Sequence, residues 1–206
     1  MRYDAEHKQK TRERVITVAK HAIRRDGVAN LGVAAVMKDA GLTHGGFYAH
    51  FASRDALVAA AIEDMLPGAR ARFLKVTDGL APAEALGTYI DRYLSATHRD
   101  SASWMCPLPV LTTDMKQLQP EMREAFGRAA AGLAGLLQPM LATLGHEDPQ
   151  IGWSVVSELV GALALARAIG ATEASDAVLD ASRISIRRRV GLPASAAAFP
   201  ATGTVQ

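Results

Sequence analysis

Two short apolar stretches separated by a glycine-containing turn constrain the fold of this chain more than any other feature. Residues 33–40 and 44–51 are each long enough for a short helix, and Gly41-Leu42-Thr43 lies between them. Before them, residues 8–25 carry apolar side chains at the i, i+3, i+4, i+7 spacing of an amphipathic helix. Gly27 then supplies a left-handed stop. Three helices in this arrangement predict a helix-turn-helix.

Capping residues predict where the neighbouring helices begin. The Thr43 hydroxyl is expected to cap the third helix, and Ser53 to cap a fourth, with Asp55 in its first turn. The fourth helix is expected to run to about Leu66, where Pro67-Gly68 breaks or kinks it.

The rest of the chain also predicts helices. Ala accounts for 39 of 206 residues, and Ala favours helices over strands. Proline start signals and apolar spacing predict helices at residues 82–98, 107–115, 120–144, 149–169 and 174–190. We therefore expect an all-α protein with an N-terminal three-helix, helix-turn-helix head on a C-terminal helical-bundle body. The expected divisions are the head at residues 1–52, the body at 53–190 and a flexible tail at 191–206.

Charge is distributed unevenly along the chain. Residues 1–54 hold ten Lys or Arg against five Asp or Glu, whereas the remaining residues hold thirteen against sixteen. A basic head on a neutral or acidic body is typical of a nucleic-acid-binding protein. The alternative is that these cations only solvate the first helix.

The second helix of the motif has two sides. Winding residues 44–51 at about 100° per residue puts Phe47 and Phe51 toward the core. The other side holds mainly small residues, with histidines on its flanks: Gly45, Gly46, Tyr48 and Ala49, flanked by His44 and His50. Two glycines there cost about 1 kcal/mol each relative to Ala, which suggests a functional reason. Without side chains, they let the helix N-terminus approach a phosphate or a base edge, unless they only loosen a loop.

The run GLTHGGFYAHFASRDAL resembles a motif of the tetracycline-repressor (TetR) family of bacterial transcription regulators, and the similarity covers about residues 10–62. The family carries Gly-x-[Ser/Thr]-x-Gly-x-[Phe/Leu]-Tyr-x-[His/Tyr]-Phe-x-[Ser/Asn]-[Lys/Arg]-[Glu/Asp]-x-Leu. The resemblance implies that the residues near the bases are Thr43, His44, Gly45 and Gly46. It also implies that Tyr48, His50 and Arg54 bind phosphates. The chain departs from the pattern at Gly32, Ala34 and Ala35, so it implies no contacts from the preceding helix.

The body contains large, soft side chains that are candidates for an effector pocket. They are Tyr89, Tyr93, Trp104, Met105, Cys106, Met115, Phe126 and Trp153. Such residues line a ligand cavity or simply fill a core. Cys106 stands before Pro107 at an expected helix start, where the dipole favours a thiolate that reacts with electrophiles. Its apolar neighbours instead favour a buried, neutral thiol.

Several other classes of protein are disfavoured. A single cysteine excludes an intrachain disulfide and suits the cytoplasm, and the charged N-terminus lacks the apolar stretch of a signal peptide. Residues 151–170 are apolar enough for a membrane span but contain Glu158 and Arg167, which favours a buried soluble helix. His44 and His50 lack the i, i+4 spacing of a helical metal site, so we expect neither metal nor cofactor.

The function that follows is a DNA-binding regulator rather than an enzyme. We expect a homodimer formed by residues 149–170 and 174–190, with Leu163 in the seam, on a near-palindromic operator. In the TetR family such a regulator is usually a repressor, here released by a small hydrophobic or electrophilic effector. One alternative is a small all-α cytoplasmic enzyme with an incidental basic N-terminus, although no catalytic spacing supports it. A regulator that needs no effector is another.

Overall fold

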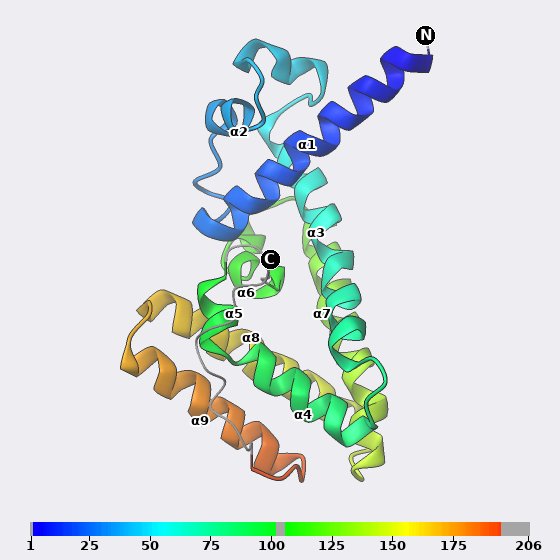
Figure 1. The fold of residues 1–206 in the computed structure, drawn as a ribbon, viewed down its shortest axis with the longest axis vertical. Helices are drawn as coiled ribbons and strands as arrows, with labels where there is room; N and C mark the ends of the chain where they lie inside the picture. The colour runs from blue at the N-terminus through cyan, green and yellow to red at the C-terminus, as the bar shows by residue number, and fades with distance from the viewer. Residues whose placement is uncertain (1, 102–105, 195–206) are drawn as a thin grey trace. The chain divides into compact units, whose positions relative to one another are not determined.

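Every regular element of the described residues is helical. The computed structural model describes residues 2–101 and 106–194 (Figure 1). They form two units, the first made of Met1–Gly68 with Val110–Phe126 and the second of Ala69–Pro109 with Gly127–Gln206. The expected all-α class is confirmed. The expected tail falls largely on residues 195–206, which lie outside the described residues, as do Trp104 and Met105.

The first unit begins with three helices in the expected order. These are α1 (Arg2–Asp26), α2 (Val33–Asp39) and a six-residue 3₁₀ helix, η1 (His44–Ala49). α2 packs against both α1 and η1. Gly27 and Gly41 end α1 and α2 with φ of 79° and 71°, as expected of left-handed stops. The buried core of this unit includes Val15, Ala19, Ile23, Val36, Met37, Phe47, Phe51, Leu57 and Ile62.

Helix α3 (Arg54–Thr77) does not end where the sequence predicted. The predicted break near Leu66 is wrong, because Pro67 lies inside a continuous helix. A proline in a helix removes one backbone hydrogen bond. Burial outweighs that loss, since Met65 is buried in the first unit and Phe73 in the second.

Two of the expected helices are each divided in the structure. The predicted helix at residues 82–98 becomes α4 (Pro82–Tyr93) and α5 (Ala96–Asp100), because Ser95 Oγ caps the second piece by accepting from His98 N at 3.1 Å. The predicted helix at 107–115 is shorter, α6 (Pro107–Leu111), and is followed by the 3₁₀ helix η2 (Met115–Gln117).

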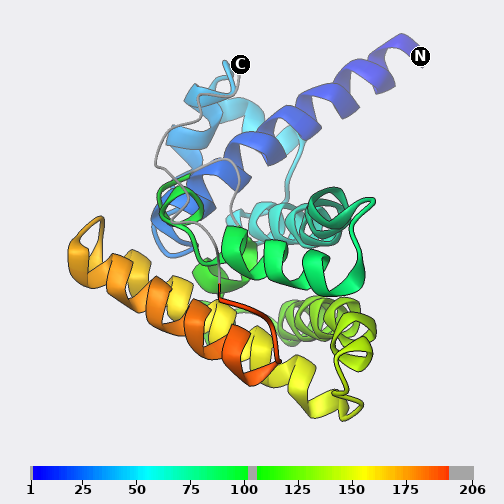
Figure 2. The same ribbon diagram turned by 60° about the horizontal axis from the view of Figure 1, so that its bottom comes forward.

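The last three helices match their predicted ranges. They are α7 (Pro120–Thr143), α8 (Pro149–Ile169) and α9 (Glu173–Arg189). α9 turns back after Gly170 and packs along α8 (Figures 1 and 2). By length and composition alone, α8 is apolar enough to cross a membrane, and within the described structure it packs against α9. Leu163 of α8 is fully buried within this unit, which corrects its placement in a seam between subunits.

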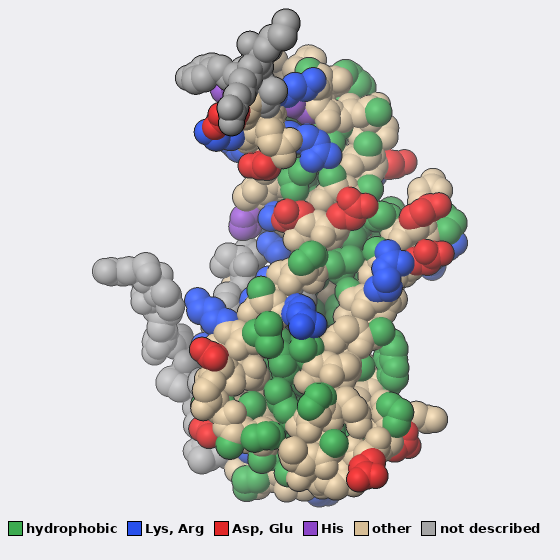
Figure 3. Space-filling view, turned by 90° about the vertical axis from the view of Figure 1, so that its right-hand side faces the viewer, with side chains coloured by type: hydrophobic (Ala, Val, Ile, Leu, Met, Phe, Trp, Pro, Cys, Tyr) green, Lys and Arg blue, Asp and Glu red, His purple; other side chains and the backbone are tan. Residues whose placement is uncertain are grey.

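Parts of the second unit expose hydrophobic side chains. Figure 3 shows one face on which such side chains lie among polar ones in the lower part of the view. The large exposed hydrophobic residues of this unit are Leu74, Trp153, Leu165, Ile169 and Ile184. Isolated exposed hydrophobic residues are ordinary, so only those that share a helix face suggest an interface.

Candidate nucleic-acid interface and ligand cavity

The turn between α2 and η1 is fixed by the backbone. Gly41 N donates to Lys38 O and Leu42 N to Met37 O, both at 2.9 Å, which is the pattern of a left-handed helix end. η1 is a 3₁₀ helix, so the expectation of an α-helix is corrected. The Thr43 side chain forms no capping hydrogen bond, which corrects the predicted cap. Gly45 and Gly46 lie in the first turn, and glycine disfavours an α-helix because it loses much backbone freedom there.

Burial in η1 follows the two sides predicted from the sequence. Phe47 and Phe51 are buried and stack at 5.7 Å between ring centroids. Tyr48 is 71% exposed, and its ring meets Phe47 edge-on at 5.3 Å. The other predicted contact residues divide into exposed ones, Thr43, His44 and Gly45, and partly exposed ones, Gly46 and His50. The segment therefore presents polar side chains and two glycines to solvent, while its aromatic pair is buried.

A cationic cluster stands beside the end of η1. His50 is partly buried, and its Nδ1 has no hydrogen-bond partner among the described residues. Burial, together with the charges of Lys8 and Arg12, lowers the pKa of His50, so the imidazole is neutral near pH 7. The Arg12 guanidinium lies 4.9 Å from the centre of the Phe51 ring. Sequence reasoning missed Lys8 and Arg12, although their i, i+4 spacing on α1 places both on one face.

Arg54 differs from the other predicted contact residues because its guanidinium is engaged inside the unit. Its Nε donates to Leu31 O at 3.0 Å, and its Nη2 donates to the carbonyls of Val28 and Ala29. The residue thus joins the start of α3 to the loop between α1 and α2. Its geometry is that of a positioning residue for the motif.

A second segment of the chain completes the first unit. Asp114 Oδ2 accepts from Val28 N at 2.9 Å, next to the left-handed Gly27. Met115, expected in an effector pocket, is instead buried in the core of this unit, and Phe126 packs against the same core. Both lie in the first unit because the chain returns there between residues 110 and 126.

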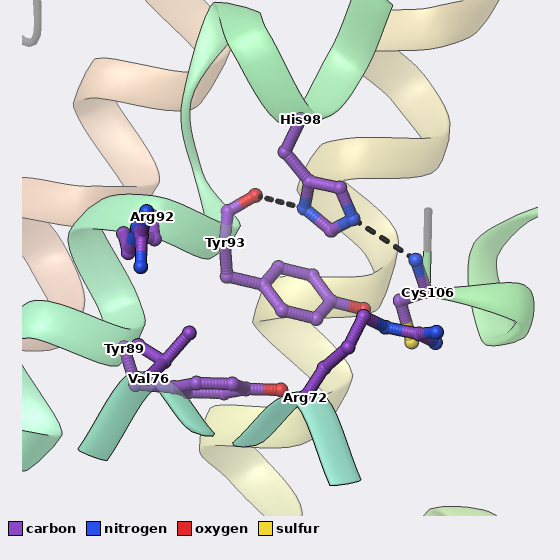
Figure 4. A pocket seen from close by; sticks show the side chains of 7 residues that line it. All are labelled: Arg72, Val76, Tyr89, Arg92, Tyr93, His98 and Cys106. Atoms are coloured by element: carbon purple, nitrogen blue, oxygen red, sulfur yellow. Dashed lines mark hydrogen bonds between the residues drawn. The ribbon is translucent and has the colours of Figure 1, made fainter. Parts of the chain in front are cut away.

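The second unit contains a cavity that gathers three of the predicted pocket residues. Tyr89, Tyr93 and Cys106 line it, whereas Trp153 is half-exposed on α8 and is not among the lining residues. The lining residues that sequence reasoning missed are Arg72, Val76, Arg92 and His98 (Figure 4). No sequence motif marks them, because they come from three separate helices, α3, α4 and α5. The cavity is small, about 20 Å³, which suits a group the size of a water molecule.

His98 holds the wall of this cavity together. Cys106 N donates to His98 Nε2 at 3.0 Å, so Nδ1 carries the proton and donates to Tyr93 O at 2.8 Å (Figure 4). Burial lowers the pKa of His98 to about 4, and the charges of Arg167 and Arg72 act in the same direction. Both ring nitrogens are therefore occupied in the neutral form, and neither serves the Cys106 sulfur as a base.

The Cys106 thiol is buried and neutral. Burial raises its pKa, more than the hydrogen bond with Tyr93 and the nearby Arg72 and Arg167 lower it. The helix α6 does begin at Pro107, as the expected effect of the helix dipole required. The local environment nevertheless favours the less reactive protonated form. Among the described residues, no group of three or more His, Cys, Asp or Glu is placed to hold a metal ion.

Comparison with known proteins addresses the family and the fold. Residues 15–61 match the family model described as bacterial regulatory proteins, tetR family. This region covers the C-terminal half of α1, then α2, η1 and the start of α3, and so includes the predicted contact residues of η1. No curated protein compared with the chain matches it.

Solved structures resemble the chain over nearly its whole length. A TetR-family transcriptional regulator from Cytophaga hutchinsonii has a TM-score of 0.76 at 18% identity, over 92% of this chain and 98% of that one. The reduced form of NemR from E. coli has a TM-score of 0.75 at 19% identity, over 90% and 100%. RolR, solved in complex with resorcinol, has a TM-score of 0.57 at 22% identity, over 92% of each chain. At these identities the similarity shows the fold.

Proposed function

The chain belongs to the TetR family by its N-terminal domain and has the fold of that family's transcriptional regulators, and from this premise we propose that it is a dimeric repressor released from its operator by a small-molecule effector. The observation that carries the DNA-binding part is the exposed η1 above a buried aromatic pair, with the cations of α1 beside it. We assign base contacts to the N-terminal end of η1 and phosphate contacts to its C-terminal end.

The base-contacting residues are proposed as Thr43, His44, Gly45 and Gly46. Replacing Gly45 by alanine tests the N-terminal end of η1, because an ideal Cβ on Gly45 meets no atom within 4 Å. Gly45→Ala should therefore fold normally. We expect it, like His44→Ala, to change the preference among operator sequences, because a base-edge contact discriminates by about 1–3 kcal/mol.

The phosphate-contacting residues are proposed as Tyr48 and His50, with Lys8 and Arg12 of α1 beside them. Tyr48→Phe and His50→Ala should weaken binding to all sequences alike, because phosphate contacts carry no base information. Arg54 is assigned to holding the motif together through its loop carbonyls, rather than to a phosphate.

A salt titration tests DNA binding itself. The logarithm of the association constant for duplex DNA should fall linearly with the logarithm of salt concentration. The reason is that lysine and arginine side chains bound to phosphates displace counterions from the DNA. Lys8→Gln should reduce the magnitude of the slope by about one unit. Lys75→Gln, at an exposed position of α3 in the second unit, is the matched control and should leave the slope unchanged. Absence of salt-dependent binding by the unmodified protein would refute the proposal.

Dimer formation is proposed through α8 and α9. Their outer faces expose Leu165 and Ile184, and small residues such as Gly161, Ala177 and Ala181 are exposed on the same helices. A second copy of the chain would cover these side chains and place two heads on a near-palindromic operator.

Effector release is proposed through the cavity of the second unit. RolR is a protein of this fold solved with a bound phenolic ligand, resorcinol, which supports a ligand-binding role for the helical body. The effector of this chain is proposed to be small, because the cavity is narrow. A sensing role for Cys106 stays a prediction, and its buried, neutral thiol argues for non-covalent binding.

A further inference from the structure

The cavity of the second unit has two arginines at or beside it, Arg72 and Arg167, that form no ion pair with a carboxylate within the described residues. The buried arginines of this unit do form ion pairs: Arg99 with Asp100 and Asp176, and Arg187 with Asp91. Asp100 lies within electrostatic range of Arg167, but its carboxylate is held by Arg99 at 2.7 Å. A partly buried guanidinium without an ion-pair partner is favoured by a bound anion.

The hydrogen-bond donors of these groups are also unused. Arg72 Nη2 and Arg167 Nη1 are buried without partners among the described residues, although Arg167 Nη2 donates to His98 O at 3.0 Å. The hydroxyl of Tyr93, a residue 3% exposed, lacks an oxygen or nitrogen partner there and meets only the sulfur of Cys106, a weak acceptor. Within the described residues, two buried guanidinium nitrogens and one buried hydroxyl therefore lack an oxygen or nitrogen acceptor.

Two of these donors, Arg72 and Tyr93, line the cavity. In Figure 4, the hydroxyl ends of Tyr89 and Tyr93 point toward Arg72 and Cys106, whereas Arg92 lies apart on the other side. The charge of Arg72 acts on Tyr89, Cys106 and His98, which places its guanidinium among them. His98 adds no acceptor, because both its nitrogens are engaged.

We propose that this cavity binds the carboxylate of a small organic acid, with Arg72 and the Tyr93 hydroxyl donating to its oxygens. The proposal rests on the proposed function and specifies the chemical class of the effector as an anion. A carboxylate accepts two hydrogen bonds side by side and supplies the missing negative charge. The apolar walls, Val76 and the rings of Tyr89 and Tyr93, suit a short apolar or aromatic remainder.

The cavity volume of about 20 Å³ limits the size of the ligand. That volume holds about one water molecule, so even a small acid requires the surrounding side chains to move. Acetate and benzoate therefore serve as probes of two sizes. Acetamide and benzamide are nearly the same shape without the charge, and they measure what the negative charge contributes.

Calorimetric titration of the full chain with these four compounds, with chloride at equal ionic strength, tests the proposal. We expect at least one carboxylate to bind, and its amide to bind at least tenfold more weakly. Arg72→Gln should weaken carboxylate binding at least tenfold, because hydrogen bonds between charged partners are the stronger kind. Arg70→Gln is the matched control, since Arg70 is exposed two residues earlier on α3 and does not line the cavity.

Tyr93→Phe keeps the proposal testable if Arg72→Gln fails to fold. It removes only the hydroxyl and should also weaken binding of the carboxylate. Circular dichroism checks that the variant is folded. Equal binding of acid and amide, an unchanged affinity in Arg72→Gln or Tyr93→Phe, or no binding by either acid would overturn the proposal. Operator binding is measured separately by fluorescence anisotropy, so a protein that binds benzoate but no DNA refutes the repressor and leaves the anion site standing.

Discussion

At the scale of single residues, the second unit depends on a buried ion pair that leaves no room for a side chain beside it. Arg187 donates to Asp91 at 2.9 Å, to Pro193 O at 2.8 Å and to Gly87 O at 3.3 Å. An ideal Cβ on Gly87 would lie 3.0 Å from Arg187 Nη1. Because three partners hold the guanidinium, it cannot move away freely.

Gly87→Ala should therefore destabilise the protein, by about 1–2 kcal/mol, as overpacking in a core does. The loss should appear although alanine favours a helix, since the clash outweighs that gain. Gly135→Ala in α7 is the control, because its Cβ would meet no atom within 4 Å, and it should gain about 0.5–1 kcal/mol. Urea unfolding measures both. Two variants with equal stability would contradict the account of Gly87.

His98 predicts a dependence of stability on pH. Its pKa in the folded protein is about 4, below its ordinary value of 6.5, because burial disfavours the imidazolium. The unfolded chain therefore binds the proton first as pH falls. Stability from His98 is complete above pH 6.5 and declines down to about pH 4, by about 1.4 kcal/mol per pH unit.

Urea unfolding between pH 7 and pH 4 tests this dependence in the unmodified protein and in His98→Gln. Other groups also titrate in this range, including His21 and His50, whose pKa values are lowered as well. The difference between the two proteins isolates His98, and the variant should show the shallower decline. Parallel curves would mean that His98 does not titrate as its surroundings require.

The sequence predicted which side of η1 is buried, but not most of the residues that line the cavity. The spacing of Phe47 and Phe51 is local, and so it predicted which side of η1 is buried. Arg72 and His98 come together only through tertiary packing between distant segments, which no local pattern records. The hydrogen bonds of Arg54 could not be predicted for the same reason, because the carbonyl groups that accept them lie more than twenty residues away in the chain.

At the scale of elements, helix existence followed the sequence, whereas helix breaks depended on tertiary contacts. Pro67 did not end α3, because buried residues anchor the helix on both sides of it. α4 ended at Tyr93 without a proline or glycine, because Ser95 caps the next helix and His98 pairs with the carbonyl of Tyr93. Local start and stop residues are therefore only one of the factors that determine where a helix begins and ends.

Two predicted caps differ in the structure and provide a matched test. Ser53 Oγ accepts from Ala56 N at 3.1 Å at the start of α3, whereas Thr43 makes no such bond at η1. Ser53→Ala should lower the free energy of unfolding by about 1 kcal/mol. Thr43→Ala should leave it nearly unchanged, since no capping bond is lost. Thermal unfolding distinguishes the two, and an equal loss in both variants would show that the observed bond does not matter.

At the scale of the whole molecule, α8 has one side that is buried within its own chain and another that we propose contacts a second subunit. Leu163 is fully buried by its own chain, so a charge there should prevent folding rather than merely separate subunits. Leu165, two residues later, is 52% exposed, and Ile184 of α9 is 62% exposed. α8 is thus apolar on both its buried and its exposed side. The sequence alone could not show which of its apolar residues are buried within the chain.

Leu165→Glu and Ile184→Glu should yield folded monomers if α8 and α9 form the dimer. A charge buried in an interface is unpaired and costly, so the dimer dissociation constant should rise at least 100-fold. Leu74→Glu is the control, because Leu74 is 48% exposed on α3, outside these two helices. Sedimentation equilibrium gives the dissociation constants, and circular dichroism confirms the fold. Monomers should also lose operator affinity, because each then contacts a single half-site. Dimers that persist in both variants with unchanged operator binding would place the contact between subunits elsewhere on the chain.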